Sequence, residues 1–96
     1  MSKVLIKNGV RLYPVCGFQR SQHKLYYWET KAQLRVYEIE ESENVTDEEF
    51  DEAYEELEFW QDVLEYANCV YNGLIYMPYK YYNRVKEAIT MYDLLH

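Results

Sequence analysis

The segment from Thr46 to Tyr71 constrains the fold most, because its residues follow the pattern of one long amphipathic helix. Thr46 followed by Glu49 is a capping box, and acids in the first turn suit the positive end of a helix dipole. Apolar residues then recur at helical spacing for six turns: Phe50, Ala53, Tyr54, Leu57, Trp60, Leu64, Ala67 and Tyr71. The pattern predicts a helix that ends at Asn72-Gly73, with these residues as its C-cap.

The first forty residues have the composition of strands instead. Asn8-Gly9 lies between two β-rich runs, "KVLIK" and "VRLYPV", and predicts a hairpin, because both residues tolerate positive φ. Pro14 cannot donate to a strand ladder, so we expect its strand to lie at an edge or to end there. Two further runs, "KLYYWE" and "QLRVYEIE", predict a second hairpin that turns at Thr30 and Lys31.

The chain therefore divides into a strand part, residues 1–41, and a helical part, residues 46–96. The run "LIYM" reads as a connector, and Pro78 after it suits the first turn of a second helix. A chain of 96 residues has the size of one domain. We expect an α+β fold, in which a small antiparallel sheet of three or four N-terminal strands precedes two α-helices.

Charge is distributed very unevenly along this chain. Residues 1–36 hold seven bases and one acid, whereas residues 37–67 hold fourteen acids and no base. On the predicted helix, the carboxylates at Glu48, Asp51, Glu55, Glu58 and Asp62 project within one narrow stripe, opposite the apolar face. Glu52 and Glu65 flank this stripe. Like charges four residues apart destabilise a helix by about 0.2–0.5 kcal/mol per pair, and no lysine relieves them here.

This uncompensated charge predicts a binding surface. We expect the carboxylates to imitate a nucleic-acid backbone and to bind a basic, nucleic-acid-binding protein. The small size, acidity and aromatic content are typical of inhibitors from phages and mobile elements, including anti-CRISPR and anti-restriction proteins. Two simpler interpretations compete with this one: the acids form a solvated face, or they pair internally with bases of the strands and the second helix.

Other residues are weaker candidates for an interface. On the predicted second hairpin, Tyr26, Trp28, Arg35 and Tyr37 fall on one face, and Tyr, Trp and Arg dominate interface hot spots. On the long helix, a second apolar stripe of Phe59, Val63, Tyr66 and Val70 needs cover from the fold or from another subunit. This second stripe predicts a homodimer. A homo-oligomeric interaction module, such as an antitoxin or immunity-type protein, is therefore the alternative function.

Nothing in the sequence predicts catalysis, a metal or a cofactor. His23 and His96 are far apart in sequence, and with Cys16 and Cys69 they lack the spacing of a metal site. No glycine-rich phosphate loop is present. The net charge of −7 repels phosphate, so we expect no direct binding of nucleic acid. The first ten residues have too short an apolar run for a signal peptide, and no run is long enough to span a membrane, so we expect a cytoplasmic location.

Overall fold

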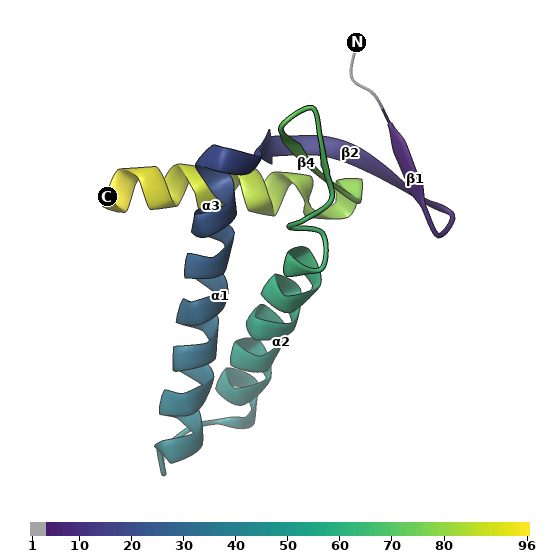
Figure 1. Ribbon diagram of the computed structural model, residues 1–96. Coiled ribbons are helices and arrows are strands. Elements are labelled where there is room, and N and C mark those ends of the chain that lie inside the picture. The colour runs from purple at the N-terminus through teal and green to yellow at the C-terminus, as the bar shows by residue number, and fades with distance from the viewer. Residues whose placement is uncertain (1–3) are drawn as a thin grey trace.

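The computed structural model describes residues 4–96 and has the predicted α+β fold, with four antiparallel strands and three α-helices among these residues (Figure 1). Lys3, which begins the first predicted strand, lies outside the described residues. In chain order the elements are β1 (Leu5–Lys7), β2 (Val10–Gly17), α1 (Phe18–Glu41), α2 (Asp47–Leu64), β3 (Val70–Tyr71), β4 (Leu74–Met77), the 3-10 turn η1 (Tyr79–Tyr81) and α3 (Tyr82–Leu95).

The sheet combines two hairpins: β1-β2 precedes helices α1 and α2 in the sequence, and β3-β4 follows them. The strand order is β1-β2-β4-β3. The predicted first hairpin is confirmed: Lys7 pairs with Val10, and Asn8 and Gly9 have φ of 53° and 79°. Among the described residues Pro14 pairs with β4 only, since the β1 pairing extends no further along β2 than Leu12, and the β2–β4 register shifts between Pro14 and Cys16. Pro14 therefore occupies a local edge, where its missing N–H costs no ladder bond.

The prediction for Asn72-Gly73 was wrong. These residues have φ of 51° and 76° and form the turn between β3 and β4, and the run "LIYM" is strand β4. Helix α2 ends at Leu64, well before Tyr71. An Asn-Gly pair can cap a helix or turn a hairpin, and here the unpaired edge of β2 supplies a partner for β4.

The second predicted hairpin was also wrong, since its two runs belong to the single helix α1. Between Phe18 and Glu41 the chain has no glycine or proline, so nothing breaks the helix near Thr30. The buried residues Leu25, Ala32 and Val36 follow helical spacing and pack mainly against α2. Tertiary packing thus overrides the β propensity of the tyrosine-rich and valine-containing runs.

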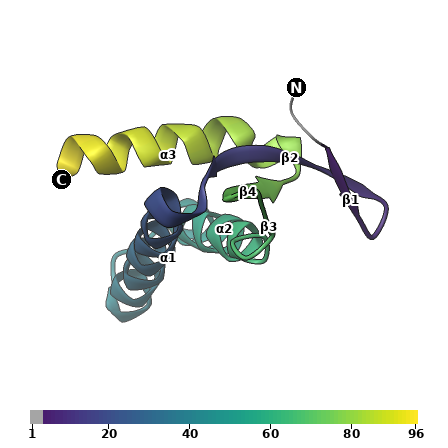
Figure 2. The same ribbon diagram turned by 45° about the horizontal axis from the view of Figure 1, so that its top comes forward.

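Helices α1 and α2 form an antiparallel hairpin that extends away from the sheet (Figure 1). The predicted start of α2 is confirmed: Thr46 is the N-cap, and its Oγ1 accepts a hydrogen bond from the Glu49 N–H at 3.2 Å. Helix α3 crosses the sheet end of this hairpin, with the sheet beside it (Figure 2). The result is an elongated molecule, 51 × 33 × 18 Å.

One cluster of buried residues joins the sheet to all three helices. Val15 and Met77 of the sheet, Leu25 of α1, Val63 of α2 and Val85 of α3 belong to this cluster, and each is at most 2% exposed. Pro78 was predicted in the first turn of the second helix; it is instead the N-cap of η1, and α3 begins at Tyr82. On α3, Val85 is buried but Leu94 and Leu95 are exposed, so this helix projects beyond the core at its C-terminal end.

Candidate partner-binding surface

Six acidic residues of α2 and its C-cap Glu65 lie along the outer side of the helix, and we call this line of residues the acidic ridge. It consists of Glu48, Asp51, Glu52, Glu55, Glu58, Asp62 and Glu65, all of them exposed. The opposite side of α2 carries the buried residues Ala53, Leu57 and Trp60. Because one face of the helix is held in the core, the carboxylates of the other face are displayed on a rigid support.

No carboxylate of the acidic ridge makes an ion pair or a side-chain hydrogen bond with any residue in 4–96. The ion pairs within this range are Lys24–Asp93 at 2.6 Å, Arg35–Glu38 at 3.7 Å and Arg84–Glu56 at 2.7 Å. Of these, only Glu56 belongs to α2, and it lies between α2 and α3, away from the ridge. Internal pairing therefore accounts for Glu56 and leaves the charge of the ridge uncompensated.

The far end of the helical hairpin concentrates further acids beside the ridge. Glu38, Glu40 and Glu41 end α1, Glu43 lies in the connecting loop, and Asp47 begins α2. In the same region the Tyr54 hydroxyl donates a hydrogen bond to Glu40 Oε1, which ties the two helices together. This bond, followed by desolvation and the nearby Glu40 charge, raises the pKa of Tyr54 above its usual value.

The predicted face of Tyr26, Trp28, Arg35 and Tyr37 does not exist, because these residues belong to a helix. Tyr26 and Tyr37 are exposed on the outer side of α1. Trp28 instead packs toward the core, and its Nε1–H donates to the Ala88 carbonyl oxygen at 2.9 Å. Arg35 is exposed and makes the long contact with Glu38. In a strand, side chains alternate between two faces, whereas in a helix they point in directions about 100° apart. The four residues therefore share a face in the predicted strands but not in the helix, which explains the error.

The stripe of Phe59, Val63 and Tyr66 lies within the fold. Val63 is fully buried, and the rings of Phe59 and Tyr66 lie 5.6 Å and 6.1 Å from that of Tyr81 in η1. Val70, the fourth member of this stripe, lies in β3 instead and is 40% exposed. The stripe thus has internal cover, and its residues no longer give a reason to expect a dimer.

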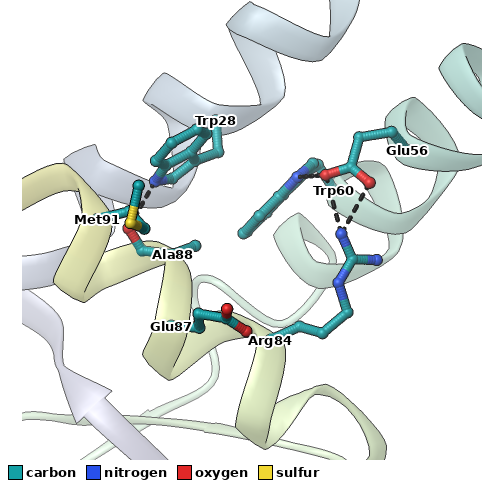
Figure 3. Close-up of a pocket in the computed structure, with 7 residues that line it drawn as sticks. All are labelled: Trp28, Glu56, Trp60, Arg84, Glu87, Ala88 and Met91. Atoms are coloured by element: carbon teal, nitrogen blue, oxygen red, sulfur yellow. Dashed lines mark hydrogen bonds and ion pairs between the residues drawn. The ribbon is translucent and has the colours of Figure 1, made fainter.

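A pocket of about 340 Å³ opens where the three helices meet (Figure 3). Glu56 accepts a hydrogen bond from Trp60 Nε1 at 3.0 Å, and its two oxygens lie 2.9 and 2.7 Å from Arg84 Nη2. The Arg84 guanidinium also lies 3.9 Å from the centroid of the Phe59 ring. The remaining lining residues are Trp28, Glu87, Ala88 and Met91. These contacts fasten α2 to α3, and sequence periodicity gave no signal of them.

The two cysteines and two histidines lie in different surroundings in the described part of the chain. Cys16 and Cys69 are free, and burial raises the pKa of the Cys16 thiol above its usual value, which keeps it protonated. His23 and His96 are brought together by the fold, since both rings contact Tyr92, at 5.6 and 4.3 Å between ring centroids. Within residues 4–96 no three His, Cys, Asp or Glu side chains are grouped so as to hold a metal ion.

Across the described residues, no helix combines the length and the apolar character that crossing a membrane requires. No protein-family model, curated protein or solved structure matches the chain.

Proposed function

We propose that the protein is an inhibitor that binds a basic, nucleic-acid-binding protein through the acidic ridge. The observation that carries this proposal is the line of exposed carboxylates on one rigid helix, none of which is paired with a base in residues 4–96. A protein surface that needed only solubility would have its acids interleaved with lysines, as such pairing stabilises helices.

The spacing of the charges suits a groove that normally holds a phosphate backbone. The seven carboxylates of the acidic ridge, from Glu48 to Glu65, extend over roughly 25 Å at the rise of an α-helix. This is one charge per roughly 3.6 Å, close to the roughly 3.4 Å per charge of one DNA strand. A basic groove built for nucleic acid therefore meets a comparable density of negative charge.

Rigid support favours this use of the ridge. A charged segment that becomes ordered only on binding loses conformational entropy, which weakens the complex. Here α2 is already held by the core, by the Tyr54–Glu40 hydrogen bond toward α1 and by the Glu56–Arg84 pair toward α3. The ridge is thus preorganised for its partner.

An inhibitor of this kind acts where its target acts, so the proposed location is the cytoplasm of the host cell. Small acidic proteins of phages and mobile elements that block CRISPR or restriction systems fit this description. The proposed activity is binding alone and requires no catalytic residue or cofactor. The alternative, a homo-oligomeric module of the antitoxin or immunity type, draws its support from the exposed Tyr26, Leu34 and Tyr37 on α1.

The test removes the ridge charge and follows partner binding. A partner is captured from host extract with the tagged wild-type chain, purified and titrated with a variant in which Glu48, Asp51, Glu55, Glu58 and Asp62 become Gln or Asn. Binding should weaken by at least about 100-fold, or about 2.8 kcal/mol. Wild-type affinity should fall steeply with salt, and duplex DNA should compete for the same site.

Two pairs of substitutions with the same change in net charge provide the control. E55Q/E58Q removes two charges from the ridge, and E29Q/E87Q removes two elsewhere. The ridge pair should weaken binding and the other pair should leave it nearly unchanged. If the five-site variant binds as well as wild type, the ridge is only a solvated face and the proposal is wrong. A thermal melt of that variant at or above the wild-type temperature would show that its loss of binding is not a loss of folding.

A further inference from the structure

One side of α1 is uncharged and carries large apolar side chains, although 28% of the chain's residues are charged. This outer face consists of Tyr26, Thr30, Gln33, Leu34 and Tyr37. The spacing of these residues places them in one stripe, opposite the buried residues of α1. Tyr26 is 44% exposed, Leu34 54% and Tyr37 53%. Within residues 4–96, neither tyrosine makes a side-chain hydrogen bond or a ring contact.

The charges that flank the outer face have opposite signs at the two ends of α1. Arg20 and Lys24 lie in the first two turns, whereas Glu38, Glu40 and Glu41 end the helix and Glu43 follows it. Lys24 is paired with Asp93, and Arg20 makes no ion pair with any described residue. Glu29, Lys31 and Arg35 lie between these ends, outside the outer face, so the sign of the charge reverses after Arg35 while the outer face itself carries no charge.

We propose that the outer face of α1 is a dimer interface, in which α1 pairs with α1 of a second copy in antiparallel orientation. Centring this pair between Lys31 and Ala32 sets Tyr26 opposite the partner's Tyr37 and Thr30 opposite the partner's Gln33. Aromatic and aliphatic residues then meet along the contact. The five residues of the outer face follow one another at intervals of 4, 3, 1 and 3 positions, which suits the side-by-side packing of two helices.

The reversal of charge is what identifies the occupant as a second copy. In a twofold interface the same patch must complement itself, so each end of α1 must suit the opposite end. The antiparallel pair brings Arg20 toward the acidic end of the partner's α1, at Glu41 and at Glu43 in the loop that follows. The helix dipoles are also antiparallel in this arrangement. A parallel pair would instead set the acidic ends of both copies against each other.

The same orientation suits the charge distribution of the whole molecule. Bases predominate toward the sheet end of the elongated fold, and acids predominate along the helical hairpin. An antiparallel dimer places the acidic tip of each copy beside the sheet end of the other. Because α2 packs on the opposite side of α1, the acidic ridge of each copy stays exposed. The inference is therefore independent of the proposed function.

Sedimentation velocity of the full chain tests the interface at micromolar concentrations. The wild type should be a dimer, and L34E should increase the dimer dissociation constant by at least about 100-fold, since two buried charges meet near the twofold axis. L94E is the matched control, because Leu94 is 76% exposed on α3 and undergoes the same chemical change. It should dimerise as the wild type does. A monomeric wild type, or an L34E protein that still dimerises, would overturn the proposal.

Cysteine cross-linking tests the orientation. Y26C and Y37C proteins of different tag mass are prepared in a C69S background, where the remaining Cys16 is buried. With oxidised glutathione as the oxidant, the mixture should give the Y26C–Y37C heterodimer in large excess over either homodimer. Homodimers of each single variant would indicate a parallel pair, and no cross-linked product would indicate that the outer faces do not meet. Either result contradicts the antiparallel interface.

Discussion

Helices α1 and α2 lie side by side and share one core, yet their outer surfaces differ sharply. The outer side of α2 is a line of carboxylates that pair with no base in residues 4–96, whereas the outer face of α1 is neutral and aromatic. Packing between α1 and α2 therefore does not determine which residues occupy the outer face of either helix. The inner faces determine the fold, and the outer faces are free to serve two different kinds of binding.

The largest expected effect on the free energy of unfolding distinguishes a buried residue of α1 from an exposed one. Leu25 is fully buried and Leu34 is 54% exposed on the same helix, so L25A and L34A make the same change in opposite environments. L25A should lower the free energy of unfolding by about 2–5 kcal/mol. L34A should change it by no more than about 0.5 kcal/mol, measured on the monomer. Urea denaturation gives both values, and similar losses for the two variants would contradict the assignment of these faces.

A smaller effect on stability should distinguish the two sides of α2, at the adjacent residues Glu55 and Glu56. Glu56 accepts the Trp60 Nε1–H and pairs with Arg84, whereas Glu55 belongs to the acidic ridge. E56A leaves the indole N–H of a buried tryptophan without a partner and should cost about 1–2 kcal/mol. E55A removes a repulsion with Asp51 and should be neutral or slightly stabilising. Thermal melts of the two variants make the comparison, and a greater loss for E55A would mean that the ridge is paired internally after all.

The smallest effect concerns the hydrogen bond that joins the two helices, from Tyr54 to Glu40. This bond raises the pKa of Tyr54 in the folded state. Its contribution is therefore fully present below the pKa of an unfolded tyrosine, and is lost as pH rises through the folded value. Y54F should be slightly less stable than wild type at neutral pH, and the difference should vanish at strongly alkaline pH. Urea denaturation at both pH values tests this, and a difference that persists in alkali would exclude the bond as its source.

The sequence predicted the parts of this fold that depend on local signals. The Asn8-Gly9 hairpin, the Thr46 N-cap and the outward position of the acids on α2 all follow from residues close together in the chain. The long helix α1 escaped prediction because its runs rich in tyrosine and valine suit strands as well. The available signal was the spacing of Leu25, Ala32 and Val36, seven and four positions apart, which is typical of the buried face of a helix.

The remaining errors arose where the outcome depends on distant contacts. Asn72-Gly73 turns a hairpin because β4 finds the edge of β2, about sixty residues earlier in the chain. Phe59 and Tyr66 are covered by Tyr81, which no local pattern could assign to them. The residues of the acidic ridge could be predicted since exposure on a helix follows from its periodicity. Their partner is not encoded in that pattern.

The strand pairing of β2 with β4 means that the whole helical hairpin is an insertion between neighbouring strands of one sheet. The chain leaves the sheet at Phe18 and returns to it at Val70 in β3, and the Phe18 N–H donates to the carbonyl oxygen of Gly73 in the β3–β4 turn at 2.8 Å. Helices α1 and α2 can therefore change in length at the end far from the sheet without altering the strands. Adding about seven residues to each helix would extend the hairpin by roughly 10 Å, or two turns. The sheet thus acts as a constant base, from which evolution or design can adjust how far the charged arm reaches.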